Sequence, residues 1–234
     1  MQDPPLPLMI FAAGFGTRMG ALTANRPKPL ITVAGRALID HAVDLADAAG
    51  AADVVVNLHY LGDQIEAHLA HRKIRFAWER EQILETGGGL KAALPLLRPG
   101  PVMMLNSDGI WTGQNPLSEL LAQWNRERMD ALVLLLPVEE ALGHGPKSDF
   151  LLDADGRIAR ANGARGHVYI GAGILNPEVL AEIDEQVFSL NRAWDRLIAR
   201  RRAFGAVHRG GWCDVGHPEG IAMAEALLRS ATDA

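Results

Sequence analysis

The stretch that decides the fold is Phe11-Ala12-Ala13-Gly14-Phe15-Gly16-Thr17-Arg18, which is followed by Arg26-Pro27-Lys28-Pro29-Leu30. The apolar run of residues 8–13 is short and lies between prolines and glycines, so it predicts a buried strand. Gly14 and Gly16 let the backbone approach a ligand closely, and their N–H groups can face an anion. Arg18 and Lys28 bring positive charge to the same loop. The stretch therefore predicts a strand that ends in a polyphosphate-binding loop.

Composition and charge narrow the class of protein. The chain has 234 residues, of which 48% are hydrophobic and 22% charged, as in a globular domain with a sizeable core. The net charge of -5 disfavours a nucleic-acid partner but is compatible with a local basic pocket for a small anion. The single cysteine, Cys213, excludes an internal disulfide and a multi-cysteine zinc site. We expect no nucleic acid among the partners.

Two features bear on where the protein acts. No apolar run approaches the length needed to cross a membrane. The start, Met1-Gln2-Asp3-Pro4-Pro5, lacks the basic and apolar regions of a signal peptide. Together with the lone cysteine, which fits a reducing compartment, these features predict a cytoplasmic protein without a membrane partner.

Apolar runs alternate with helical spacings along the first half of the chain. We expect strands over residues 8–13, 53–58, 74–78, 102–106 and 131–136, and helices over 38–49, 62–71, 88–97 and 117–128. This order predicts an α/β fold, with a Rossmann-like, mixed but mostly parallel sheet and helices on both faces. Ligands of such sheets bind beyond the carboxyl ends of the strands, where the glycine loop, Asn57 and Asp108 fall.

The pattern changes in the second half. Residues 149–160 predict a hairpin that turns at Asp153-Ala154-Asp155-Gly156, and strands follow over 167–175 and 206–208. Helices are expected over residues 190–202 and 218–229. We therefore expect one domain over 1–234. Its nucleotide-binding half is roughly 1–137, and a small acceptor-binding insertion and a closing helix fill roughly 138–234.

Three kinds of phosphate-binding loop can be considered for the first stretch, residues 11–18. A P-loop needs four residues between its first glycine and a Gly-Lys-Ser/Thr triplet, which is absent. A dinucleotide fingerprint needs glycine at position 19 and an acidic residue after the second strand, where Met19 and Asn57 stand. Residues 12–18, with Pro27-Lys28-Pro29-Leu30, instead resemble the signature of the sugar-1-phosphate nucleotidyltransferases, also called nucleoside-diphosphate-sugar pyrophosphorylases.

The resemblance extends along the chain. Asn106-Ser107-Asp108 and Trp212-Cys213-Asp214-Val215-Gly216 are similar to the family's two metal-binding segments, which implies that Asp108 and Asp214 hold Mg2+. Leu84-Glu85-Thr86-Gly87-Gly88-Gly89 resembles the loop that receives the base. The resemblance further implies that Arg18 holds the leaving phosphates and that Lys28 stabilises the α phosphate as charge develops there.

Contacts to the two substrates are expected from further residues. The nucleotide contacts that the resemblance implies are Ala12, Ala13, Gly14, Gly16, Thr17, Glu85, Gly87, Gly88 and Asn106. For the acceptor sugar phosphate we expect Asp149, Gly171, Glu139 and Lys147, of which Lys147 could meet a phosphate or a substrate carboxylate. A surface role for Glu139 and Lys147 stays open at this point, as does a helix-capping role for Asp108.

The substrates are narrowed by three features. The Glu-Thr-Gly-Gly-Gly form, the short chain, and Gly143-His144-Gly145-Pro146-Lys147-Ser148-Asp149-Phe150 resemble the N-acetylmuramic acid 1-phosphate uridylyltransferases of cell-wall recycling. This resemblance implies UTP and N-acetylmuramic acid 1-phosphate as substrates, and a monomer or small homo-oligomer. Open alternatives are dTTP or UTP with glucose 1-phosphate, CTP with phosphocholine, and a non-catalytic regulatory protein that binds nucleotide sugars.

Overall fold

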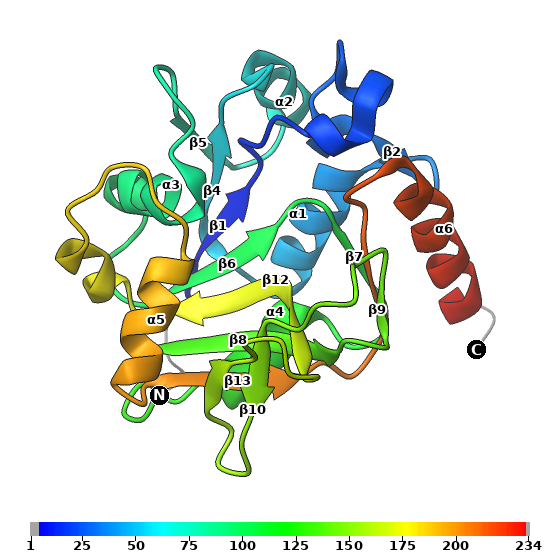
Figure 1. Ribbon diagram of the computed structural model, residues 1–234. Helices are drawn as coiled ribbons and strands as arrows, with labels where there is room; N and C mark the ends of the chain where they lie inside the picture. Colours follow the sequence, from blue (N-terminus) through cyan, green and yellow to red (C-terminus); the bar gives the residue numbers. More distant parts are fainter. Residues whose placement is uncertain (1–4, 233–234) are drawn as a thin grey trace.

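The computed structural model describes residues 5–232 (Figure 1). Residues 1–4, on which part of the expectation about a signal peptide depends, and residues 233–234 lie outside this range. The described chain forms one nine-stranded sheet, a three-stranded sheet and a two-stranded hairpin. No helix between residues 5 and 232 is both long and apolar enough to cross a membrane.

The large sheet follows the order β11-β10-β12-β6-β1-β4-β5, and β8 pairs with both β12 and β13. The strands are β1 (Pro7–Phe11), β4 (Ala52–Leu58), β5 (Arg75–Trp78), β6 (Val102–Asn106), β8 (Ala131–Pro137), β10 (Phe150–Leu152), β11 (Ile158–Arg160), β12 (His167–Leu175) and β13 (Ala203–Val207). Parallel pairs join β1 to β4 and β6, β4 to β5, and β13 to β8. Because β12 runs antiparallel to both β6 and β8, those two strands share one direction. The expected mixed, mostly parallel sheet is confirmed.

Helices cover both faces of this sheet (Figure 1). The α-helices are α1 (Leu38–Ala48), α2 (Gly62–Leu69), α3 (Glu85–Ala93), α4 (Pro116–Gln123), α5 (Asn191–Ala199) and α6 (Pro218–Thr232). Short 3-10 helices are η1 (Thr17–Thr23), η2 (Lys28–Leu30), η3 (Leu94–Leu96) and η4 (Pro177–Glu182).

Side chains of the central strands alternate between two cores, because successive residues of a strand point to opposite faces. Leu8 and Ile10 of β1 pack in a core with α1, α2 and α4, whereas Met9 packs in the core that holds α3 and α5. In β4, Val56 faces the first core and Val55 the second. Burial on both faces therefore explains why these strands read as continuous apolar runs.

A second, smaller sheet has the order β7-β14-β9, with β7 (Gly109–Trp111), β14 (Trp212–Asp214) and β9 (Ala141–Leu142). The β2 (Thr32–Val33) and β3 (Arg36–Ala37) hairpin lies nearby, and both β14 and β2 pack against α6 at one side of the molecule (Figure 1). Sequence patterns did not predict these short strands. They matter for the site, because β7 follows Asp108 directly and β14 ends at Asp214.

Several predicted boundaries were wrong. The helix expected to reach residue 128 ends at Gln123, because Trp124 turns to an extended conformation. The helix expected over 190–202 ends at Ala199, and the strand expected at 206 begins at Ala203, since Arg201 adopts a left-handed conformation with φ 57°. The helix expected from residue 88 begins at Glu85.

The two halves share one sheet. Strand β12 comes from the half expected to bind the acceptor, yet it lies between β6 and β8 of the other half. The predicted hairpin is β10 and β11, which extends the sheet beside β12 (Figure 1). A site beside β6 and β12 is therefore built from both halves of the chain.

Candidate active site

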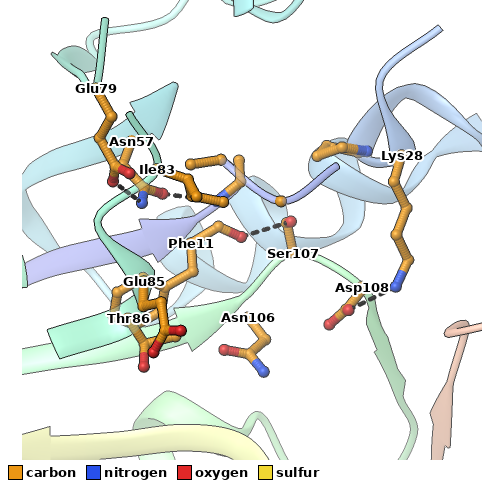
Figure 2. Close-up of a pocket in the computed structure, with 14 residues that line it drawn as sticks. Phe11, Lys28, Asn57, Glu79, Ile83, Glu85, Thr86, Asn106, Ser107 and Asp108 are labelled. Carbon is orange, nitrogen blue, oxygen red and sulfur yellow. Dashed lines mark hydrogen bonds and ion pairs between the residues drawn. The ribbon is translucent and has the colours of Figure 1, made fainter. Parts of the chain in front are cut away.

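A cavity of about 210 Å³ lies where β1 and β6 end, and it is bordered by the loop before α3 (Figure 2). Its lining residues are Phe11, Ala12, Ala13, Gly14, Lys28, Pro29, Asn57, Glu79, Ile83, Glu85, Thr86, Asn106, Ser107 and Asp108. These residues come from the carboxyl ends of neighbouring strands and from the first glycine loop. This is the position that a parallel sheet offers to a ligand.

Asn57 and Glu79 form one end of this cavity (Figure 2). Asn57 Oδ1 accepts a hydrogen bond from Ala12 N at 2.7 Å, and Asn57 Nδ2 donates to Glu79 Oε1 at 2.7 Å. Glu79 Oε2 accepts from Leu84 N at 2.7 Å. The buried carboxylate thus connects the end of β5 both to the glycine loop and to the loop before α3.

Lys28 and Asp108 form the other end (Figure 2). Lys28 Nζ lies 2.7 Å from Asp108 Oδ2, and the two side chains are 11% and 30% exposed. Lys28 is therefore a largely buried cation that is held at the mouth of the cavity by a carboxylate. A cation placed in this way can neutralise phosphate charge with little reorganisation.

Asp214 joins this end through the small sheet. Asp214 pairs with Gly109 across β14 and β7, and Val215 N donates to the Asp108 carbonyl at 2.9 Å. A Cβ atom placed on Gly216 would lie 2.6 Å from Asp214 Oδ2 and 3.0 Å from Arg18 Nη1. The carboxylate and the guanidinium therefore border the same glycine, and Gly216 leaves the space between them open.

Charge around Asp214 is unbalanced. Burial and the neighbouring charge of Asp108 raise the pKa of Asp214, while Lys28, Arg18 and His144 act in the opposite direction. A buried carboxylate close to a second carboxylate is a donor set that a divalent cation would stabilise.

The donor set fits magnesium. Mg2+ prefers oxygen ligands and usually takes one or two carboxylates together with water and substrate phosphates. Asp108 and Asp214 provide the carboxylates, and the adjoining cavity provides room for a phosphate. No group of three or more His, Cys, Asp or Glu side chains suited to a metal occurs among residues 5–232, so a cage made by the protein alone is absent there.

The glycine loop occupies the place expected for it. Ala12, Ala13 and Gly14 line the cavity. Gly16 has φ +65°, and a Cβ atom on it would lie 2.9 Å from Lys28 Cβ, so glycine is needed for both conformation and close packing. Thr17 begins η1 and is exposed.

The loop expected to receive the base divides into two parts. Glu85 lines the cavity beside Thr86. Gly87 and Gly88 are buried, and their N–H groups both donate to the Phe188 carbonyl, at 2.9 and 3.0 Å. In this structure these glycines allow the segment around residue 188 to pack on α3, and they do not line the cavity.

A second cavity, of about 230 Å³, adjoins the first, because Thr86 and Asn106 line both. Its other lining residues are Asp149, Phe150, Arg160, Tyr169, Ser189, Leu190, Asn191 and Trp194. Asp149 therefore lines a cavity that adjoins the one bordered by the glycine loop.

Tyr169 lines this second cavity, and Gly171 packs against Asn106, another of its lining residues. Asp149 Oδ2 accepts from Tyr169 N at 2.9 Å. The Tyr169 hydroxyl is buried without a partner in the described chain, and burial followed by the charge of Asp149 raises the pKa of this phenol. Gly171 has φ +79° and packs against Asn106, whose Nδ2 would lie 2.8 Å from a Cβ atom at this position.

Glu139 and Lys147 line a different hollow. This hollow, of about 640 Å³, shares no lining residue with the two cavities above. Glu139 forms an exposed ion pair with Arg165 at 2.9 Å. A backbone hydrogen bond to its carboxylate, followed by the Arg165 hydrogen bond, holds the pKa of Glu139 below its usual range. Glu139 and Lys147 thus line neither the cavity of the glycine loop nor the cavity that contains Asp149.

Sequence reasoning missed two charged residues of the site. Glu79 follows β5 directly, so the rule that ligands bind at the carboxyl ends of parallel strands could have identified it. Arg160 ends β11 and lines the second cavity, but nothing in its sequence surroundings distinguishes it from Arg157. Trp194 of α5 is buried and also lines the second cavity.

Comparisons with known proteins agree with this geometry. The model of a family described as MobA-like NTP transferase domain matches residues 8–209. An N-acetylmuramate alpha-1-phosphate uridylyltransferase from Caulobacter vibrioides is 43% identical over 242 residues, which cover 99% of this chain and 100% of that protein. A protein with the same name from Neisseria meningitidis serogroup B is 34% identical, over 94% of this chain and 96% of that one.

The fold is also that of solved nucleotidyltransferase-like structures. HddC from Yersinia pseudotuberculosis, solved with GMP-PN, superposes with a TM-score of 0.76 at 18% identity and covers 95% of this chain and 99% of that one. The expected fold class and the expected family resemblance are confirmed. The chain belongs to the family of proteins with a MobA-like NTP transferase domain.

Proposed function

We propose that this protein is a magnesium-dependent nucleotidyltransferase that joins N-acetylmuramic acid 1-phosphate to UTP and releases pyrophosphate. The product would be UDP-N-acetylmuramic acid, formed in the cytoplasm for cell-wall recycling. One observation carries the proposal: Lys28, Asp108, Asp214 and Arg18 converge at one end of a cavity lined by the glycine loop. The names of the two uridylyltransferase relatives support the choice of substrates.

The acceptor needs little activation. The second pKa of a phosphate monoester is about 6, so at neutral pH the sugar phosphate is already mostly dianionic. One of its oxygens attacks the α phosphorus of the triphosphate, the bond between that phosphorus and the bridging oxygen breaks, and pyrophosphate leaves. Because no proton has to be removed, the protein's task is to bring two anions together in line.

Each charged residue has a part in that task. Lys28, held in place by Asp108, is positioned to stabilise the charge that develops at the α phosphate. Arg18 is exposed beside Gly216 and can hold the leaving β and γ phosphates. Asp108 and Asp214 would hold Mg2+, which supplies further neutralisation of phosphate charge when it is bound.

The experiment that tests this proposal is pyrophosphate release by purified protein. UTP, dTTP, CTP, ATP and GTP are each combined with N-acetylmuramic acid, N-acetylglucosamine, glucose and mannose 1-phosphates and with phosphocholine. Each pair is measured with Mg2+ and with EDTA. We expect the highest kcat/KM for UTP with N-acetylmuramic acid 1-phosphate, and loss of turnover in EDTA. Preference for another pair would replace the substrates, while nucleotide binding without turnover of any pair would favour the regulatory alternative.

A further inference from the structure

The second cavity contains a charged side chain with no part in the proposed phosphate chemistry. Among the ten described residues that line it, Asp149 and Arg160 are the only charged ones. Three aromatic residues, Phe150, Tyr169 and Trp194, form much of the remaining wall, with the Tyr169 and Trp194 rings edge to face at 6.2 Å. Such a wall suits the apolar face of a sugar ring, and a carboxylate such as Asp149 suits sugar hydroxyls.

Arg160 is held firmly at this wall. Its Nε donates to Asp195 Oδ1 at 2.7 Å and its Nη2 donates to the Asn191 carbonyl at 3.0 Å. The guanidinium carbon lies 5.0 Å from the centre of the Phe150 ring, which is the cross-strand partner of Arg160. Its Nη1 donates no hydrogen bond within residues 5–232. The fork is thus fixed on one side and free on the other.

A fixed guanidinium with a free donor is suited to a carboxylate. Hydrogen bonds between a guanidinium and a carboxylate are stronger than those between neutral groups, and a planar fork gives them direction. Asp195, the existing partner, is 60% exposed and contacts the guanidinium only through Nε, so Nη1 keeps its donors for a further acceptor. An acceptor that carries its own carboxylate would meet repulsion from Asp149 and attraction from Arg160.

N-Acetylmuramic acid has such a group. It differs from N-acetylglucosamine by a lactyl ether whose carboxylate is ionised at neutral pH. We propose that Arg160 binds this carboxylate and thereby selects an acidic amino-sugar 1-phosphate over its neutral counterpart. The inference rests on the proposed function. It replaces Lys147, the cation that the sequence suggested for this contact, because Lys147 lines a hollow that shares no residue with the two cavities.

The test compares two acceptors in one enzyme. UTP-dependent kcat/KM is measured for N-acetylmuramic acid 1-phosphate and for N-acetylglucosamine 1-phosphate, in the wild type and in Arg160→Ala. Loss of one hydrogen bond to a charged group is expected to lower kcat/KM for the muramic acid derivative roughly 10- to 100-fold. The loss should lie mainly in KM, since the contact is distant from the reacting phosphates. Turnover of the neutral acceptor should change by less than about threefold.

The chain offers a matched control. Arg157 lies on the same hairpin, pairs with Asp155 at 2.6 Å and lies 5.4 Å from the Phe204 ring centre, but it borders a different hollow. Arg157→Ala should leave the ratio of the two acceptors unchanged. If Arg160→Ala does not fold, Arg160→Gln repeats the test, because its stem can still cover Phe150. Turnover of the neutral acceptor reports that the site is intact.

A chemically blocked substrate isolates the contact itself. When the lactyl carboxylate of the acceptor is converted to a methyl amide, wild type and Arg160→Ala should turn over this amide acceptor equally well. An unchanged acceptor ratio in Arg160→Ala, or a selective loss in Lys147→Ala instead, would overturn the assignment and leave the proposed function in place. A wild-type enzyme without preference for the acidic acceptor would overturn both the Arg160 assignment and the proposed acceptor.

Discussion

Lys28 Nζ and Asp108 Oδ2 lie 2.7 Å apart, although 80 residues separate them along the chain. The pair joins η2, which follows the glycine loop, to the residue that leads from β6 into β7. Asp214 approaches the same point from β14. Three charged residues from three distant segments therefore meet at one end of the cavity that the glycine loop lines.

Lys28→Ala should lower kcat at least about 100-fold, because a preorganised charge at the α phosphate acts mainly in the transition state. The KM for UTP should rise much less. Steady-state kinetics at varied UTP would check this, with Lys73→Ala as the control, since Lys73 is exposed and borders a remote hollow. Equal losses in binding and in kcat would contradict a transition-state role.

Asp214→Asn should abolish magnesium-dependent turnover while leaving the apo protein as stable as the wild type, or more stable. Burial and Asp108 raise the pKa of Asp214, so ionisation of this group at neutral pH costs folding free energy. Stability due to the protonated form is present at low pH and lost as the pH rises through the raised pKa. The advantage of the variant should thus grow from acid to neutral pH.

Thermal unfolding in EDTA and in Mg2+ would check this expectation. Wild type should gain stability with Mg2+ and Asp214→Asn should gain less, whereas Asp184→Asn, at an exposed position, should behave as wild type. A variant that is much less stable than wild type in EDTA would show that Asp214 serves the fold rather than a metal.

Glu79→Gln should weaken nucleotide binding and cost about 1–3 kcal/mol of folding free energy. Both Glu79 oxygens accept hydrogen bonds, from Asn57 Nδ2 and from Leu84 N, so an amide would place a donor against one of these donors. Urea unfolding and KM for UTP would measure the two effects. Glu81→Gln is the control because Glu81 is exposed. Equal changes in the free energy of unfolding and in KM for the control would argue against a role for the Glu79 hydrogen bonds.

Gly171→Ala should cost about 1–3 kcal/mol, since φ +79° is strained for alanine. The new methyl group would also press on Asn106, which lines both cavities, so KM for the sugar phosphate should rise. Gly163→Ala separates the two effects, because Gly163 has φ +89° with nothing within 4 Å of its Cβ position. Identical kinetics in the two variants would exclude a positioning role for Gly171.

Asp130→Asn should destabilise the protein at neutral pH but not in acid. A hydrogen bond from Arg202, followed by its charge, holds the pKa of Asp130 below the usual range. The contribution of the ionised Asp130 carboxylate to the free energy of unfolding is therefore present above the unfolded pKa of about 3.9. It is lost as the pH falls through the lower pKa of the folded state. Because the pair is partly exposed, about 0.5–1 kcal/mol is expected. Urea unfolding of wild type and Asp130→Asn from neutral to acid pH would check this expectation. A difference in the free energy of unfolding that does not shrink in acid would contradict it.

Much of the site was already visible in the sequence. Each buried strand of the large sheet can be recognised in the sequence by its own apolar run. The carboxyl ends of parallel strands meet at one edge of the sheet. Ala12, Gly14, Lys28, Asn106 and Asp108 could thus be placed around one cavity before the fold was known. The glycine loop itself carries this information, because its chemistry is local to a few consecutive residues.

Only the tertiary structure could decide the remaining contacts. Strands of two or three residues, such as β9 and β14, have no period long enough to read, so the approach of Asp214 to Asp108 depends on pairing across the chain. The sequence predicts Gly87 and Gly88 as nucleotide contacts, and the structure shows that their N–H groups donate to the carbonyl of Phe188, which is 101 and 100 positions away. In the sequence, Arg160 and Lys147 are both basic residues that can meet a carboxylate. The structure separates them, because the β10–β11 hairpin places Arg160 on the cavity beside Asn106, whereas Lys147, which precedes β10, lines a separate hollow. The sequence alone thus determined which chemistry is present, while long-range packing determined which charged groups share a cavity.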